Sequence, residues 1–257
     1  TGLYEAGFAS SRVLLITGQT ESVDYGKGRA AGHEAEKQLP MLRTVARAVE
    51  SPRYTQDLAP AVFRVAADIQ TGRPQPGAIE MCIDLQYGKT SVPVGEPIRV
   101  EPVRPQGDTI NRAVDMIGSA SKRVILAGGG VVNGGASAEL QQLAEALNAP
   151  VFVSGNGRGA IPDDHPLAMG QFINRRNVLD AMQDCDLVIA IGTRFRGPMR
   201  AWETLPGKLI HIDVDPQVHG LVVTPDVSVI ADAKESVKAL LASMNAKPGD
   251  ASFVKGL

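Results

Sequence analysis

The clearest pattern in the sequence is a regular alternation of helical and strand segments from residue 108 to about residue 245. The helical segments place apolar residues at intervals of three and four, which predicts helices with one buried face. Between them lie short, wholly apolar runs at 124–127, 151–153, 187–191, 209–212 and 227–230. Such runs are typical of strands in a parallel sheet covered on both faces. The pattern predicts a doubly wound α/β domain over residues 108–250.

Residues 1–90 show a second α/β pattern with fewer strands. Apolar runs predict strands at 13–17 and 78–85, and helical spacing predicts helices at 35–49 and 60–71. Two strands make a poor independent sheet, so we interpret this segment as the later part of a domain. Residues 91–107 carry Pro93, Pro97, Pro102 and Pro105 with few periodic apolar positions. This composition predicts an extended linker between the two domains.

Composition and charge narrow the classes of partner. The chain has 44% hydrophobic and 21% charged residues and a net charge of −2, without a basic stripe, which disfavours nucleic acid and anionic membranes as partners. No apolar run approaches the about 18 residues of a membrane span, and no signal peptide is recognisable. Cys82 and Cys185 lie in apolar runs, as expected of buried, reduced thiols in a cytoplasmic protein.

A glycine-rich turn follows the first strand of the larger domain. The strand at 124–127 runs into Gly128, Gly129 and Gly130, and we expect a helix from about Gly135. Glycines let a ligand approach the backbone, and amides at a helix start suit a phosphate. Asn133, however, stands where a dinucleotide fingerprint has its third glycine, and the next strand ends without a carboxylate. A NAD-dependent dehydrogenase is therefore disfavoured, and a tight turn without ligand remains open.

Polar residues follow the other predicted strands, at what should be one edge of the sheet. They include Ser154, Arg194, Asp213 and Asp232, although Arg194 suits a surface ion pair and Asp213 and Asp215 suit a turn before Pro216 equally well. At His33–Glu34 a histidine directly precedes a carboxylate, a pattern more typical of a solvated helix start than of a catalytic dyad. Neither a catalytic triad nor metal-ligand spacing is recognisable. The residues alone indicate a nucleotide-type binding domain.

Several stretches together resemble one enzyme family. They are TGLYEA followed by VLLITGQT, then RVILAGGGV, NGRGAIPDDHPLAMG, DLVIAIGTRF, and LIHIDVDP followed by VIADA. In this order they resemble the thiamine-diphosphate-dependent enzymes that include acetolactate synthase, pyruvate oxidase and the 2-oxo-acid decarboxylases. The resemblance covers nearly the whole chain.

The resemblance implies a division of roles. Residues 1–90 would be the C-terminal part of the domain that binds the pyrimidine of thiamine diphosphate, and 108–250 the central domain. The glutamate that activates the cofactor would precede Thr1, and the Mg²⁺-binding motif would follow Leu257, so we expect this chain to be inert alone. The full-length enzyme would decarboxylate or ligate a small 2-oxo acid as a homodimer or homotetramer.

The resemblance also assigns candidate site residues. His33 and Glu34 fall where the synthases carry Phe-Gln-Glu near the cofactor, which makes them candidate catalytic residues. The central domain would hold FAD or ADP through Gly128, Gly129, Gly130, Ser154, Met169, Gly170, Gly192, Thr193, Arg194, Asp213 and Asp232. The synthases continue Arg-Phe with Asp-Asp-Arg, a signature broken here after Phe195. Alternatives are a nucleotide-binding regulatory module and a NAD-linked enzyme on a related fold. No metal ligand is expected within the chain.

Overall fold

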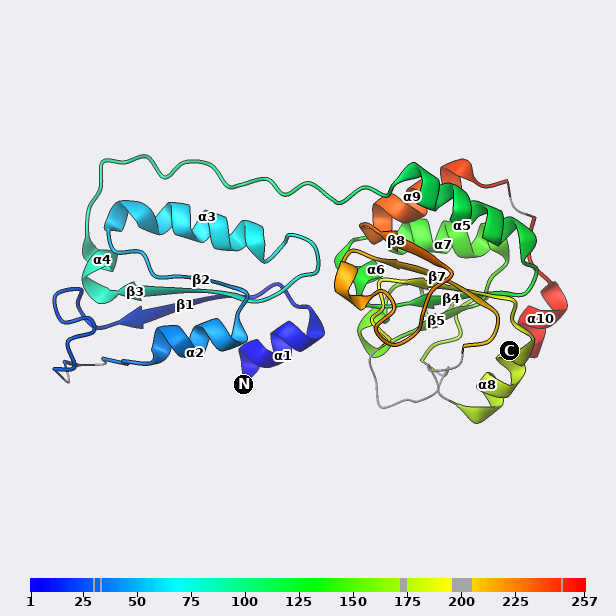
Figure 1. Cartoon of the computed structure of the whole chain (residues 1–257), viewed down its shortest axis with the longest axis horizontal. Coiled ribbons are helices and arrows are strands. Elements are labelled where there is room, and N and C mark those ends of the chain that lie inside the picture. The colour runs from blue at the N-terminus through cyan, green and yellow to red at the C-terminus, as the bar shows by residue number, and fades with distance from the viewer. Residues whose placement is uncertain (30, 33, 172–174, 196–204, 246) are drawn as a thin grey trace. The chain divides into compact units, whose positions relative to one another are not determined.

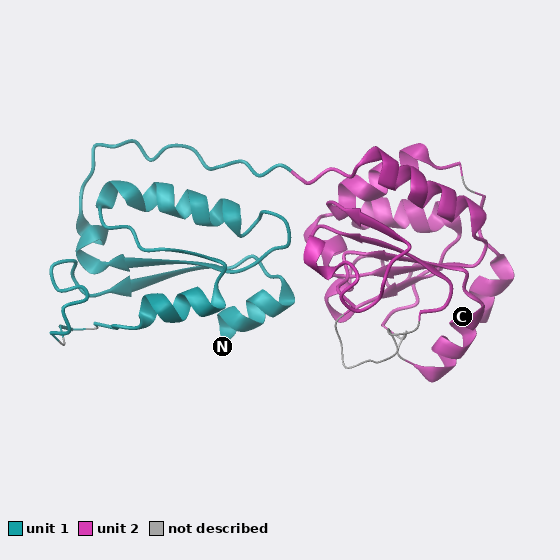
Figure 2. Cartoon of the chain, in the orientation of Figure 1, with its two compact units in different colours: residues 1–101 teal, residues 102–257 magenta. Residues whose placement is uncertain are grey.

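The computed structural model of the chain (Figure 1) describes residues 1–29, 31–32, 34–171, 175–195, 205–245 and 247–257. The chain divides into two compact units, Thr1–Glu101 and Pro102–Leu257, shown in separate colours in Figure 2. The division falls inside the proline-rich stretch 91–107. Each unit is a parallel sheet flanked by helices, which confirms the α/β fold class.

Unit 1 contains three parallel strands in the order β1-β3-β2. Its elements are α1 (Gly2–Ala9), β1 (Leu14–Gln19), α2 (Gln38–Val45), β2 (Ala48–Glu50), the 3-10 turn η1 (Thr55–Asp57), α3 (Leu58–Asp68), β3 (Gly77–Cys82) and α4 (Ile83–Tyr87). In Figure 1, α3 covers one face of the sheet, and α1 and α2 cover the other. Side chains of β3 alternate between these faces: Ile79 packs with Val65 of α3, whereas Ala78 packs with Leu42 of α2.

Two boundaries in unit 1 differ from the sequence prediction. The helix predicted over 35–49 is wrong at both ends, because α2 spans only Gln38–Val45 and Ala48–Glu50 forms β2. The backbone of Ala46 is extended, with φ −126° and ψ 141°, and Val49 then pairs with Ala78 of β3. The strand predicted over 78–85 ends at Cys82, where α4 begins. The prediction of two strands was therefore wrong.

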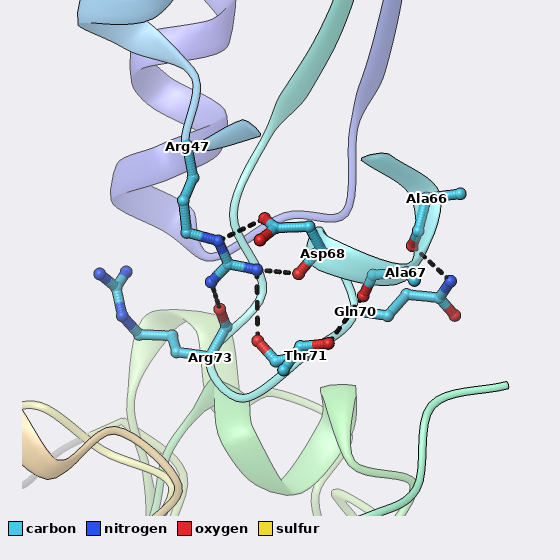
Figure 3. A network of polar contacts seen from close by, with 7 residues as sticks. All are labelled: Arg47, Ala66, Ala67, Asp68, Gln70, Thr71 and Arg73. Carbon is cyan, nitrogen blue, oxygen red and sulfur yellow. Dashed lines mark hydrogen bonds and ion pairs between the residues drawn. The ribbon is translucent and has the colours of Figure 1, made fainter. Parts of the chain in front are cut away.

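Arg47 fixes the turn between α2 and β2 against the end of α3 (Figure 3). Its guanidinium donates to the Asp68 carboxylate at 2.7 Å and to the backbone carbonyl of the same residue. It also donates to the carbonyls of Thr71 and Arg73 at 3.2 and 2.9 Å. The last carbonyls of a helix have no partner within it, so a cation here satisfies them and complements the helix dipole.

Unit 2 contains five parallel strands in the order β5-β4-β6-β7-β8. Its strands are β4 (Arg123–Ala127), β5 (Val151–Val153), β6 (Leu187–Ile191), β7 (Lys208–Asp213) and β8 (Val227–Ile230). Its helices are α5 (Gly107–Ser119), α6 (Gly129–Asn133), α7 (Ser137–Leu147), α8 (Arg176–Ala181), α9 (Ala233–Ser243) and α10 (Ala251–Gly256), with the 3-10 turns η2 (Gly155–Gly157), η4 (Met182–Asp184) and η6 (Pro216–Val218). All five predicted strands are present, but a short helix, α6, occupies the glycines themselves, ahead of the predicted helix start near Gly135.

The core of unit 2 lies on both faces of its sheet. Ile125, Ile189 and Ile210 pack with α5, α7 and α9, and their neighbours Val124, Val188 and Leu209 face a second cluster with α8 and α10. Figure 1 shows these helices on opposite sides of the strands. Within the described residues, no helix has the length and apolar character that crossing a membrane requires.

Candidate functional site

The glycines and polar residues predicted to follow the strands of unit 2 are called the rim below. The topology of unit 2 places part of this rim at a switch point, where the order of the strands in the sheet reverses. The chain runs from β4 to β5 on one side and then to β6 on the other side of β4, so the strand order reverses at β4. In doubly wound sheets, ligands bind beside the carboxyl ends of the two strands that flank such a reversal. Gly128–Gly130 follow β4 and Gly192–Arg194 follow β6, so the structure brings these two predicted groups together.

The glycines of the rim are in direct backbone contact. The Gly128 amide donates to the Ile191 carbonyl at 2.8 Å, and the Gly130 amide donates to the Gly192 carbonyl at 2.9 Å. A Cβ atom on Gly192 would lie 2.5 Å from the Cα of Gly130, and one on Gly128 would lie 2.1 Å from the Gly192 oxygen. Glycine is therefore required here for packing between loops, and the amides of Gly128 and Gly130 are already engaged by the protein.

Thr193 joins the rim to a buried histidine of β7. The Thr193 carbonyl accepts a hydrogen bond from Nε2 of His211 at 2.8 Å, and the edge of the Phe195 ring meets the imidazole at 5.0 Å between centroids. Burial lowers the pKa of His211 to about 4, so the ring is neutral and carries its proton on Nε2. Arg194, which stands between Thr193 and Phe195 in the sequence, is half-buried. His211 acts here as a structural group.

Asp213, Asp215 and Asp232 accept hydrogen bonds from backbone amides close to them in the sequence. Asp213 is buried and accepts from the Asp215 amide at 2.9 Å, and Asp215 accepts from the Gln217 amide at 3.0 Å at the start of η6. This is the turn-forming role that the sequence left open. Asp232 is the N-cap of α9 and accepts from the amides of Lys234 and Glu235. Asp213 and Asp232, both candidate cofactor-binding residues, thus also hold the loops that follow β7 and β8.

Met169 and Gly170 line a cavity of about 790 Å³ beside β5. Arg158 and Arg175 also line it, together with apolar side chains of β5 and α8. The Gly170 carbonyl accepts from the Val153 amide at 2.9 Å, which fixes this segment along the strand. Ser154, which follows β5, donates its amide to the Ala127 carbonyl at 2.9 Å. The described residues that line the cavity do not include the rim glycines.

In unit 1, Glu34 lies in the segment that connects β1 to α2, whereas His33 falls outside the described residues. One carboxylate oxygen of Glu34 accepts from the Gly28 amide at 3.0 Å. The other is buried and has no partner within the described part of the chain. The structure therefore places Glu34, and the candidate catalytic roles of His33 and Glu34 stay predictions.

Two polar residues that hold this segment were missed by sequence analysis. Gln19, at the end of β1, accepts from the Ala35 amide at 3.1 Å and donates to the Ala35 carbonyl at 3.0 Å. Glu80, in β3, is only 1% exposed and receives three hydrogen bonds. A carboxylate inside the apolar run AIEMC was the available signal, since charged residues are almost never fully buried without partners.

The two cysteines and the possible metal ligands are the remaining candidates. Cys82 and Cys185 are free and buried, as predicted, and burial raises the pKa of the Cys185 thiol to about 12. Among the residues that the structure describes, no group of three or more His, Cys, Asp or Glu side chains is arranged to hold a metal ion.

Comparisons with known proteins agree with this architecture. Residues 110–240 match the family model of the thiamine pyrophosphate enzyme central domain. A protein of Methanocaldococcus jannaschii named "Probable acetolactate synthase large subunit" is 33% identical over 95% of this chain. Glyoxylate carboligase of Escherichia coli O157:H7 is 33% identical over 94% of it. A solved structure from Mycobacterium smegmatis, classed by inference as a thiamin diphosphate-dependent enzyme, superposes on 97% of the chain with a TM-score of 0.79 at 21% identity.

The matches extend through both units but not through the whole of the related proteins. The chain spans 43% of the Methanocaldococcus protein, 42% of the carboligase and 49% of the Mycobacterium chain. The structural similarity, at its low sequence identity, supports the fold, whereas the family-model match covers about half of the residues.

Proposed function

The chain belongs to the thiamine pyrophosphate (thiamine diphosphate) enzyme family, and we propose that it is part of an enzyme that decarboxylates a small 2-oxo acid or ligates the product to a second carbonyl compound. The observation that carries this proposal is the match of residues 110–240 to the central domain, together with relatives aligned over both units. When bound, thiamine diphosphate supplies a carbanion that adds to the 2-oxo group and an electron sink for the loss of CO₂.

Within this chain, Glu34 is the residue we propose to act nearest the chemistry. The Gly28 amide holds one oxygen of its carboxylate, and the second oxygen is buried without a partner in the described part of the chain. Such an oxygen can accept a hydrogen bond from a substrate group or hold a proton. His33, its neighbour in sequence, would share this contact with substrate or with the cofactor of a second subunit in a homodimer or homotetramer.

We assign the binding of Mg²⁺ and of the diphosphate group to the longer polypeptide. The described residues of this chain form no cluster of three or more candidate metal ligands. We therefore propose that the 257 residues alone do not turn over a 2-oxo acid. The whole protein's reaction is thus a property of an assembly larger than this chain.

A nucleotide at the switch point of unit 2 stays a prediction. Its support is the position of Gly128–Gly130 and Gly192–Arg194 beside the reversal of strand order. The amides of Gly128 and Gly130, however, donate to backbone carbonyls and do not fit the role of a phosphate cradle. FAD would appear as flavin absorbance in the purified full-length protein, and ADP as a nucleotide released on denaturation.

The function is tested by measuring CO₂ release from a panel of 2-oxo acids, including pyruvate and glyoxylate, by the full-length protein. We expect turnover of at least one member that disappears when thiamine diphosphate and Mg²⁺ are removed and returns when both are restored. A folded protein that bound thiamine diphosphate but released no CO₂ from any member would count against the proposal.

A further inference from the structure

Glu80 is a buried carboxylate at the carboxyl side of the sheet in unit 1. It is 1% exposed and lies on β3, on the face that carries Ala78 and is covered by α2. Its first oxygen accepts from the Tyr25 hydroxyl at 2.8 Å and from the Ser51 hydroxyl at 3.3 Å. Its second oxygen accepts from Nε2 of Gln38 at 3.0 Å. Three donors that are 29, 42 and 55 residues from Glu80 in the sequence therefore meet on one carboxylate.

Burying a carboxylate at this position costs free energy of folding, whereas burying an apolar side chain would not. Burial removes the carboxylate from water, and only hydrogen bonds or a nearby cation offset that loss. Its neighbours along β3, Ala78 and Ile79, pack as ordinary core residues. Here the hydrogen bonds come from three side chains, and the guanidinium of Arg53 stacks on the Tyr25 ring at 3.9 Å. The arrangement is therefore built to fix those donors in place.

Of the three donors, Tyr25 lies in the connection between β1 and α2, and Gln38 is the first residue of α2, directly after it. Its described residues, 20–29, 31–32 and 34–37, form turns and irregular backbone. Tyr25 ties the first half to Glu80, and Gln38 ties the start of α2 to Glu80 and, at 2.8 Å, to the Gly18 carbonyl. Gln19 holds Ala35 between them by two hydrogen bonds. Glu34 is thus bracketed by two anchoring points.

We propose that Glu80 is a positioning residue that holds the 20–38 connection, and with it Glu34, at the carboxyl edge of the unit 1 sheet. The mechanical part of this proposal stands on the hydrogen bonds alone. Its catalytic consequence rests on the proposed function, because only then does the place of Glu34 matter for a reaction. Glu80→Gln turns one accepting oxygen into a donating NH₂ group, so Tyr25 and Gln38 can no longer both be held, and the segment between them loosens.

The mechanical part is tested in the full-length protein by hydrogen–deuterium exchange with Glu80→Gln. The matched control is Glu50→Gln on the adjacent strand β2, which breaks the ion pair of Glu50 with Arg64 at 2.6 Å without touching the connection. We expect peptides covering 20–38 to exchange at least about tenfold faster in Glu80→Gln and at the wild-type rate in the control. Unchanged exchange in Glu80→Gln, or equal acceleration in the control, overturns the proposal.

Tyr25→Phe provides a milder variant should Glu80→Gln fail to fold. It removes one of the three hydrogen bonds, and we expect faster exchange of residues 20–29 with less change near Gln38. If both variants fold, the double variant should accelerate exchange of residues 20–29 by less than the product of the two single effects, because Tyr25 acts through the same side chain. Additive acceleration of the 20–29 region would contradict this route.

The catalytic part is read from steady-state kinetics of the same variants. We expect Glu80→Gln to lower kcat at least about tenfold while the affinity for thiamine diphosphate stays at the wild-type value, and Glu50→Gln to keep wild-type kcat. Wild-type kcat in a variant with faster exchange would overturn the catalytic part alone. Absence of turnover in the wild-type protein would instead contradict the proposed function, and the exchange result would still decide whether Glu80 holds the connection.

Discussion

Gly130 and Gly192 face each other across the loops that follow β4 and β6, and neither position has room for a side chain. The Gly192 backbone has φ of 61°, and an added Cβ would lie 2.5 Å from the Gly130 Cα. The two residues also share a hydrogen bond of 2.9 Å from the Gly130 amide to the Gly192 carbonyl. This contact joins the two strand ends at which the order of the sheet reverses.

Gly192→Ala is expected to lower the free energy of unfolding of the chain by about 2–5 kcal/mol, the sum of a left-handed backbone and an overpacked contact. Gly135→Ala is the matched control, because its φ of 62° is nearly the same but no atom lies within 4 Å of the added Cβ. The control should lose only about 1–2 kcal/mol. Denaturant titration of both variants measures the difference, and equal losses would show that the contact contributes nothing.

His211 makes the stability of unit 2 depend on pH. Burial lowers its pKa from 6.5 to about 4 in the folded state, with Phe195 and His219 against its ring. Below pH 6.5, His211 binds a proton in the unfolded chain, whereas in the folded chain it does so only when the pH falls to about 4. Stability is therefore present above pH 6.5 and is lost as the pH falls toward 4, by up to about 3 kcal/mol.

His211→Gln keeps a donor near the Thr193 carbonyl but does not titrate. We expect its free energy of unfolding to fall less than that of the wild type between pH 6.5 and 4, by about 3 kcal/mol, because carboxylates titrate alike in both proteins. Thermal unfolding at half-unit pH steps supplies both curves. Parallel curves across this window would refute the assignment of a buried, neutral His211.

At the scale of elements, Arg47 holds the start of β2 against the end of α3. Its guanidinium donates to the carboxylate and carbonyl of Asp68, the last residue of α3, and to the carbonyls of Thr71 and Arg73 beyond the helix. Arg47→Met should cost about 2 kcal/mol, because the carbonyls lose a charged donor. Arg64→Met, which breaks the exposed pair with Glu50, should cost about 0–1 kcal/mol. Denaturant titration compares the two, and a smaller loss in Arg47→Met would contradict this role.

The elements of unit 2 were predictable from the sequence because each strand is an apolar run closed by a polar or glycine residue. The runs at 187–191 and 227–230 coincide with β6 and β8. In unit 1, β2 has only three residues, and Val49 continues the helical spacing of α2, so periodicity alone could not separate them. Short strands are defined by pairing with β3, which a local pattern does not contain.

The candidate site was predictable in position but not in its contacts. Parallel strands end on one edge, so the rim residues could be grouped from the sequence. The engagement of the Gly128 and Gly130 amides by the loop after β6 depends on partners more than 60 residues away. Glu80 is similar, since its partners are 29, 42 and 55 residues distant. Tertiary partners of this kind leave no local spacing to recognise.

At the scale of the whole molecule, the chain carries a five-stranded doubly wound unit and a three-stranded unit, and it spans less than half the length of the two curated relatives described above. The family-model match falls within unit 2, whereas the candidate Glu34 and its anchors lie in unit 1. The proposed chemistry therefore draws on residues of both units.

The most direct test of this account is the rate at which the proton on C2 of the thiazolium ring of thiamine diphosphate exchanges with D₂O, because it requires no knowledge of the substrate. Acid-quenched samples read by proton NMR supply the rate. With Mg²⁺ and saturating full-length protein, we predict exchange about 10²–10⁴-fold faster than for the free cofactor, the range of a positioned acid–base group. The 257-residue chain alone should leave the free rate unchanged. Exchange at the free rate in the full-length protein, with the cofactor bound, would contradict the account.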